Sequence, residues 1–144
     1  MIYCDSSFLL SLYIGTESLS TAARELAISF EEAIALVWLT ELEVSTTLYR
    51  SVRGALLHKT LAAIEAARNE GILVRCTLPE EAYQSRAQQL SKQHAARIGC
   101  RTLDILHVAF ALEIASAFFV SFDRRQRQLA KAVGLKVLPQ RQDP

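Results

Sequence analysis

Short apolar runs along the chain alternate with longer segments in which apolar residues recur every three or four positions. The short runs predict β-strands over 1–5 (MIYCD), the latter part of 32–39 (EAIALVWL), 71–76 (GILVRC), 117–123 (AFFVSFD) and 135–139 (LKVLP). The periodic segments predict helices over 6–14, 16–30, 40–53, 54–70, 79–99, 102–115 and 124–134. Because strands that alternate with helices form βαβ units, the expected fold class is α/β, a three-layer α/β/α sandwich with a central parallel sheet.

Individual residues predict where some of these helices begin and end. Ser6 or Ser7 is the expected N-cap of the first helix, and Thr40 is expected to open the helix that follows the second strand. Gly99 is a natural end for the longest helix. Residues 102–115 are apolar on nearly every side, so that helix is expected to be buried.

Composition is typical of one globular domain over residues 1–144, because 51% of the residues are hydrophobic and 22% are charged. The longest apolar stretches are broken by acids or fall short of the roughly 20 residues that cross a bilayer, and the N-terminus lacks the basic region of a secretory signal. Three widely spaced cysteines, Cys4, Cys76 and Cys100, form no CxxC pair. Free thiols are typical of reducing compartments, so we expect a cytoplasmic protein without membrane contact.

Positive charge is concentrated in the second part of the chain, although the formal net charge is only +1. Residues 1–85 carry 6 Lys and Arg against 11 Asp and Glu, whereas residues 86–144 carry 10 against 4. This asymmetry is compatible with a partner that bears phosphate groups, with dimerisation, or with an ordinary solvated surface.

Four acids fall where predicted strands end or helices begin. Asp5 and Asp123 each end a strand, Asp104 lies in the first turn of the buried helix, and Glu43 lies just inside the helix after the second strand. Sites in parallel α/β sheets form beyond the carboxyl ends of the strands. Carboxylates gathered there need a compensating cation, and ligand sets made only of oxygen suit Mg²⁺ or Mn²⁺.

Each acid also has a purely structural interpretation. Asp104 would stabilise the dipole of its helix, and Asp5 and Asp123 would cap the helices that follow them. Glu43 would be an ordinary solvated helix residue, and its neighbour Glu41 competes for the same role in a site. The spacing alone leaves these alternatives open.

At this point the sequence resembles the PIN domain family, the fold of many metal-dependent ribonucleases and of VapC-type toxins. The resemblance covers nearly the whole chain and rests on the order and spacing of four segments, each with an acid. These segments are MIYCDSSFLL, LTELEVSTTLYR, RTLDILHVAFAL and FFVSFDRRQRQLAKAVGLKV.

Carried over by position, the resemblance implies the catalytic and metal-binding acids Asp5, Glu43, Asp104 and Asp123. Glu43 fits the family pattern, in which a glutamate precedes an apolar helix that ends on a basic residue, whereas Glu41 is out of register. An additional acid that some members carry just beyond the fourth is absent, which leaves the binding of a second metal ion open. The resemblance also gives small hydroxyl residues beside the acids, Ser7 and Ser121.

The implied reaction is hydrolysis of RNA phosphodiester bonds with one or two Mg²⁺ or Mn²⁺ ions as cofactor. Ser7 and Ser121 would orient a carboxylate or a water molecule in the site. His107 shares a helical side with Asp104, and we interpret it as a packed or hydrogen-bonding residue rather than a metal ligand. Candidates for contacts with the RNA backbone are the arginines near the acids, which are Arg101, Arg124, Arg125 and Arg127.

In size, this chain is similar to the family members that form the toxin half of a toxin–antitoxin pair. That implies a homodimer and a small antitoxin whose tail lies across the acidic site. Apolar residues of SSFLLSLYI and SLSTAARELAISF would provide a groove for this partner, although core packing explains the same residues equally well.

Two other interpretations remain at this stage. A haloacid-dehalogenase-like phosphatase also ends its first strand with Asp, but it needs an acid or Thr two residues later, where this chain has Ser7. The second alternative is a catalytically inactive PIN-like module that binds RNA or protein. A scaffold has no need for converging carboxylates, so the four acids favour the enzyme.

Overall fold

The computed structural model describes residues 1–16 and 18–140, and its strands form one five-stranded parallel sheet. The strand order is β3-β2-β1-β4-β5, which confirms the predicted α/β class with a parallel sheet. The strands are β1 (Ile2–Cys4), β2 (Ile34–Leu36), β3 (Leu73–Arg75), β4 (Phe118–Val120) and β5 (Val137–Leu138). The helices are α1 (Ser6–Ile14), α2 (Ser20–Ile28), α3 (Trp38–Ser51), α4 (Gly54–Asn69), α5 (Glu80–Ile98), α6 (Thr102–Glu113) and α7 (Arg124–Ala132).

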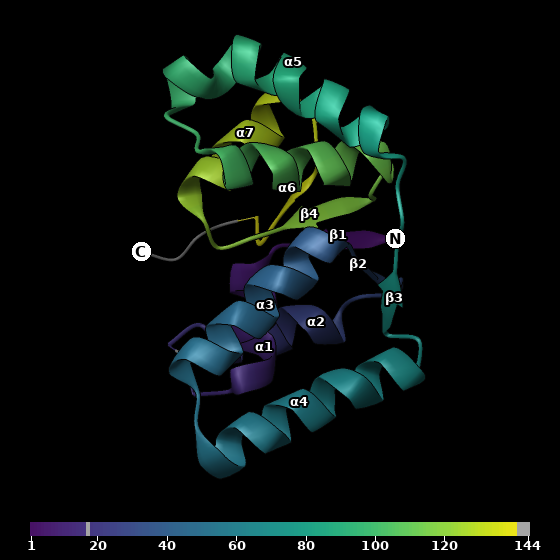
Figure 1. The fold of residues 1–144 in the computed structure, drawn as a ribbon, viewed down its shortest axis with the longest axis vertical. Helices are drawn as coiled ribbons and strands as arrows, with labels where there is room; N and C mark the ends of the chain where they lie inside the picture. Colours follow the sequence, from purple (N-terminus) through teal and green to yellow (C-terminus); the bar gives the residue numbers. More distant parts are fainter. Residues whose placement is uncertain (17, 141–144) are drawn as a thin grey trace.

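Helices cover both faces of the sheet, as a three-layer sandwich requires. Figure 1 shows α5, α6 and α7 on one side of the strands and α1, α2 and α4 on the other. The molecule has one hydrophobic core on each face of the sheet, because successive side chains of β1 point to opposite faces. Ile2 and Cys4 pack in the core with α1 and α4, whereas Tyr3 packs in the core with α6 and α7.

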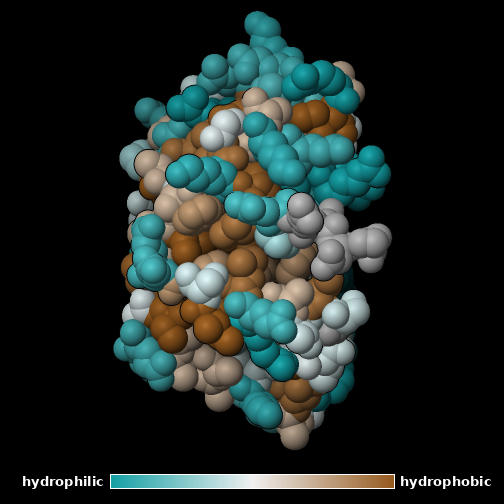
Figure 2. Space-filling model, turned by 180° about the vertical axis from the view of Figure 1, so that it is seen from behind, coloured by the Kyte–Doolittle hydropathy of each residue, from teal (hydrophilic) through white to brown (hydrophobic). Residues whose placement is uncertain are grey.

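Helix α6 is the buried helix that the sequence predicted. Val108 and Phe110 are almost completely inaccessible to solvent, and α6 lies between α5 and the sheet (Figure 1). The outer helix α5 buries only Leu90, and its hydrophilic side chains cover the upper end of the molecule in Figure 2. The charged residues of α5 therefore protect an apolar helix that carries one of the four acids.

One predicted helix start and one predicted N-cap were wrong. Helix α3 begins at Trp38 rather than Thr40, because Leu39 packs in the core beside α6 and Thr40 itself is buried. The N-cap of α1 is Asp5 and neither Ser6 nor Ser7, because the Asp5 side chain accepts the hydrogen bond from the helix N-terminus.

The predicted helix over 16–30 is shorter in the structure, where α2 spans Ser20–Ile28. Residue 17 of that prediction and residues 141–144 of the predicted domain lie outside the described residues. Among the residues that are described, no helix combines the length and the apolar character needed to cross a membrane.

Candidate functional site

Two carboxylates follow the carboxyl ends of the neighbouring strands β1 and β4. Asp5 comes directly after β1 and caps α1, accepting a hydrogen bond from the Phe8 N–H at 2.9 Å. Asp123 lies just beyond β4 and caps α7, accepting from the Gln126 N–H at 2.9 Å. Because β1 and β4 are parallel neighbours, Asp5 and Asp123 share one edge of the sheet. Asp5 and Asp123 therefore each cap a helix and also lie at a common edge of the sheet.

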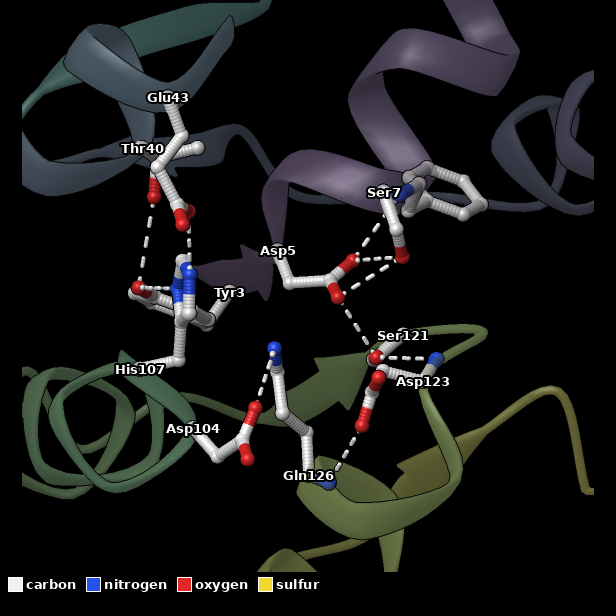
Figure 3. Close-up of polar contacts among 11 residues, drawn as sticks. Tyr3, Asp5, Ser7, Thr40, Glu43, Asp104, His107, Ser121, Asp123 and Gln126 are labelled. Carbon is white, nitrogen blue, oxygen red and sulfur yellow. Dashed lines mark hydrogen bonds and ion pairs between the residues drawn. The ribbon is translucent and has the colours of Figure 1, made fainter. Parts of the chain in front are cut away.

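Two serine hydroxyls join this pair of carboxylates. Ser7 Oγ lies 2.9 and 2.8 Å from the two carboxylate oxygens of Asp5, and Ser121 Oγ donates to Asp5 Oδ2 at 2.7 Å. Ser121 Oγ also accepts from the Asp123 N–H at 2.9 Å. Figure 3 shows Ser121 between the two acids. The structure thus places both serines that the sequence singled out beside Asp5.

Asp5 is completely buried. Burial has the largest effect on its pKa and raises it, while the charge of His107 and hydrogen bonds from Phe8, Ser121 and Ser7 oppose this effect only in part. A carboxylate withdrawn from water is costly to ionise unless a cation lies beside it. A positive charge next to Asp5 would therefore lower the free-energy cost of ionising it.

Asp104 connects to the same edge through Gln126. Asp104 Oδ2 accepts from the Arg101 N–H at 2.8 Å, which caps α6, and Asp104 Oδ1 lies 3.5 Å from Gln126 Nε2. Figure 3 shows the Gln126 side chain extending between Asp104 and Asp123. Gln126 is buried, and its Oε1 has no hydrogen-bond partner among the described residues. Gln126 was not predicted from the sequence. Its position three residues after the helix-capping Asp123 was the signal that could have placed it beside the acids.

The two glutamates of α3 lie on different sides of that helix. Glu43 Oε2 lies 2.6 Å from His107 Nε2, in the region of the other acids (Figure 3). Glu41 Oε1 instead pairs with Arg68 and Arg75, each at 2.7 Å. Residues two positions apart point in nearly opposite directions around a helix, so Glu43 and Glu41 do not share one role.

Glu43 is held as an ionised group. Partial burial raises the pKa of Glu43, but hydrogen bonds from His107 and Ser6 and the charge of His107 outweigh burial, so the pKa is lowered overall. The other ring nitrogen, His107 Nδ1, lies 2.7 Å from the Tyr3 hydroxyl. Since both nitrogens of His107 are engaged in hydrogen bonds, the structure favours a hydrogen-bonding role for this residue.

The four arginines divide into two groups. Arg101, Arg124 and Arg125 are exposed, and the last two line a depression of about 350 Å³ that Asp123 also borders. Arg127 does not fit the prediction that it contacts RNA, because it is 5% exposed and donates to three backbone carbonyls. These are Ser121 O at 2.8 Å, Leu138 O at 2.8 Å and Pro139 O at 2.6 Å.

The chemistry of these donors fits a hard divalent cation. Four carboxylates supply only oxygen, and the unpartnered amide oxygen of Gln126 adds another. Within residues 1–16 and 18–140, however, no three His, Cys, Asp or Glu side chains are grouped closely enough to hold one ion. A bound ion would therefore require the carboxylates to rotate toward one another.

A parallel α/β/α sandwich with acids at the carboxyl edge defines the class of this protein, and comparison with known proteins identifies the family. The sequence model of the PIN domain matches residues 2–132. The chain belongs to the PIN domain family, as its sequence motifs suggested.

Solved structures support the same fold. VapC20 of Mycobacterium tuberculosis, a toxin that cleaves the sarcin–ricin loop, superposes with a TM-score of 0.71 at 18% identity, over 94% of this chain and 96% of that one. FitAcB from Neisseria gonorrhoeae superposes with a TM-score of 0.63 at 15% identity, over 95% and 96% of the two chains. A search of curated protein sequences finds no significant match.

Proposed function

We propose that this PIN domain is an endoribonuclease that depends on Mg²⁺ or Mn²⁺, with Asp5, Glu43, Asp104 and Asp123 as the metal-binding and catalytic acids. The observation that carries the proposal is that Asp5, which is completely buried, and Asp123 follow the parallel neighbours β1 and β4 and share the hydroxyl of Ser121. Helix capping alone does not require the two acids to lie side by side, and carboxylates near one another ionise more easily when a cation binds between them.

In the proposed reaction, water adds to the phosphorus of an RNA phosphodiester while the bond to the leaving ribose oxygen breaks and that oxygen gains a proton. A bound divalent cation would polarise the phosphoryl group and lower the pKa of the attacking water. Ser7 and Ser121 orient Asp5 through the hydrogen bonds described above. The exposed Arg124 and Arg125 bind the RNA backbone next to Asp123.

The test is Mn²⁺ binding by calorimetry together with cleavage of total RNA in Mg²⁺ or Mn²⁺, against an EDTA control. Asp104→Asn is the informative variant, because asparagine keeps an oxygen that accepts the capping bond from Arg101 while it removes the negative charge. Asp5→Asn is less suitable, since its amide would face the donors of Ser7, Ser121 and Phe8.

The matched control is Glu113→Gln, which removes a carboxylate from the other end of α6, where it pairs with Arg86. We expect metal-dependent fragments from the wild type and the control, and none from Asp104→Asn. Equal metal binding by all three proteins, or fragments that persist in Asp104→Asn, would contradict the proposal. Metal-independent RNA binding without cleavage would instead indicate the inactive binding module.

A structured ribosomal RNA is the first defined substrate to test. VapC20, which shares this fold, is described as a toxin that cleaves the sarcin–ricin loop. An oligonucleotide with that loop, compared with one in which the loop is scrambled, would show whether this chain shares the target.

We also propose a small antitoxin as partner, bound in an apolar groove of about 500 Å³ between α1, α3 and α4. The apolar part of its lining consists chiefly of Leu9, Tyr13, Leu48, Tyr49 and Leu61. The groove includes α1, one of the two segments named from the sequence, but none of its described lining residues comes from α2. Tyr49→Asp, on an exposed rim residue, should preserve growth arrest in cells but abolish rescue by a co-expressed antitoxin.

A homodimer is proposed on the basis of exposed apolar side chains at the start of α3. Trp38 and Leu42, one helical turn apart, are 48% and 56% exposed. Burying such residues against a second copy is favourable. Light scattering should give a dimer mass for the wild type and a monomer mass for Leu42→Asp.

A further inference from the structure

A buried chain of hydrogen bonds leads from the core of the molecule to Glu43. Glu43 Oε2 lies 2.6 Å from His107 Nε2, and His107 Nδ1 lies 2.7 Å from the Tyr3 hydroxyl. The Tyr3 hydroxyl lies 3.3 Å from Thr40 Oγ1. Tyr3, Thr40 and His107 are all 0% exposed (Figure 3). The chain thus joins β1, α3 and α6 and ends on a single carboxylate at the edge of the site.

The carboxylate sets the direction of every bond in this chain. Glu43 only accepts hydrogen bonds, so His107 Nε2 donates to it. In a neutral imidazole the other nitrogen then accepts, so the Tyr3 hydroxyl donates to His107 Nδ1 and its oxygen accepts from Thr40. A tyrosine hydroxyl carries its proton at neutral pH and can therefore donate in this bond. The tautomer of His107 that is protonated at Nε2 gives all four groups a hydrogen-bond partner.

Packing holds the members of the chain in place. The Tyr3 ring is stacked on Phe119 with a centroid distance of 5.6 Å, and it meets the His107 ring edge-on at 5.9 Å. Neither ring can turn without displacing core residues. The position of His107 Nε2, and with it the position of Glu43 Oε2, is therefore determined by the core.

We propose that His107 is a positioning residue that holds the Glu43 carboxylate in one orientation for metal binding, and that Tyr3 fixes the tautomer of His107 which does so. The proposal rests on the proposed role of Glu43 as a metal ligand. The bond from His107 uses one lone pair of Oε2, and the carboxylate keeps other lone pairs with which to bind the cation. A ligand ordered before the ion arrives loses less conformational freedom on binding. A histidine that only fills the core would not influence metal affinity.

The experiment measures Mn²⁺ affinity of the RNA-free protein by calorimetry, with thermal unfolding in EDTA as a separate measure of stability. His107→Phe keeps a ring but removes the donor to Glu43, and we expect its Mn²⁺ affinity to fall about tenfold or more. His107→Gln places an amide N–H near the former Nε2 and should recover most of the affinity. His94→Gln, at a histidine of α5 that contacts Arg97, is the matched control and should bind as the wild type does.

A second readout, the tautomer of His107, does not depend on metal. Nitrogen-15 NMR of the metal-free wild type should show His107 as the tautomer protonated at Nε2, assigned by the loss of its signals in His107→Gln. Tyr3→Phe keeps the stacked ring and removes the donor to Nδ1, so the signals should shift toward a mixture of tautomers and Mn²⁺ affinity should fall.

The outcomes separate this proposal from the proposed function. Wild-type Mn²⁺ binding that is unchanged in His107→Phe and Tyr3→Phe would overturn the positioning role and leave the nuclease intact. Wild-type protein that binds no Mn²⁺ would overturn both. A His107 ring protonated at Nδ1 alone in the metal-free protein would overturn the direction of the hydrogen-bond chain. Lower affinity in both variants, with recovery in His107→Gln, supports the proposal.

Discussion

At the scale of single residues, the hydroxyl of Ser121 is the group that links two of the acids. It donates to Asp5 Oδ2 at 2.7 Å and accepts from the Asp123 N–H at 2.9 Å. Ser121 is itself completely buried, so water cannot replace it without rearrangement. One small side chain therefore joins the carboxyl end of β1 to the start of α7.

Ser121→Ala should destabilise the protein by about 1.5–3 kcal/mol, the usual contribution of a hydrogen bond to a charged group. Urea unfolding of the metal-free protein measures the change. Ser29→Ala is the control, because Ser29 is exposed and bonds only its own helix, so its cost should stay within about 0.5 kcal/mol. Equal stability of the two variants would show that the link between the acids is unimportant.

Gln126 determines how much negative charge this edge of the sheet carries. Gln126→Glu would add a fifth carboxylate beside Asp104 and Asp123, and like charges repel in a buried site. We expect a lower melting temperature in EDTA than for the wild type, and a larger increase when Mn²⁺ is added. The measurement is thermal unfolding with and without Mn²⁺, and an equal increase in both proteins would count against a metal at Gln126.

At the scale of elements, helix α7 uses its arginines for two purposes. Arg127 points inward and ties its helix to Ser121 O and to Leu138 O in β5. Arg124 and Arg125 point to solvent beside Asp123. The same helix therefore stabilises the edge of the sheet and presents positive charge to solvent where the proposed RNA substrate would bind.

Arg127→Ala and Arg124→Ala should separate these two purposes. Arg127→Ala leaves buried carbonyls without a donor and should cost about 3 kcal/mol of unfolding free energy. Arg124→Ala should leave the free energy of unfolding within about 0.5 kcal/mol of wild type but weaken RNA binding. The slope of log K for RNA against log salt concentration should become shallower by about 0.7 for each phosphate contact that is lost. Urea unfolding and RNA titrations at several salt concentrations give both quantities; RNA binding unaffected by Arg124→Ala would exclude it from the interface.

At the scale of the whole molecule, the buried Asp5 couples stability to pH. Its pKa in the folded protein is raised, so Asp5 contributes stability at low pH that is lost as pH rises through the raised value. The lowered pKa of Glu43 acts in the opposite sense, contributing stability that is lost as pH falls through the lowered value. Under the proposed function, a cation bound to ionised Asp5 would restore the stability that is lost as pH rises.

The stabilisation by Mn²⁺ should therefore increase as pH rises through the raised pKa of Asp5 and level off above it, because protons compete with the metal below that value. Melting temperatures with and without Mn²⁺ over a pH series give this difference. A metal effect that is constant with pH would contradict binding at Asp5.

The sequence alone predicted much of the fold for a physical reason. Helix and strand periodicities are local, and short apolar runs that alternate with helices leave a parallel sheet as the natural arrangement. Asp5 and Asp123 were predicted at its carboxyl edge because each directly follows an apolar run. Their helix-capping role was predicted as an alternative. In the structure both acids cap helices and also lie at the same edge of the sheet.

Contacts between distant residues were decided only by the tertiary structure. His107 and Glu43 are 64 positions apart, and Tyr3 and His107 are 104 apart, so no local pattern relates them. The burial of Arg127 depends on where β5 passes. The sequence by itself therefore determined the elements and the edge where the acids gather, since both follow from local patterns. Only the packed core decided which atoms meet there, because those distances arise when separate elements close around one another.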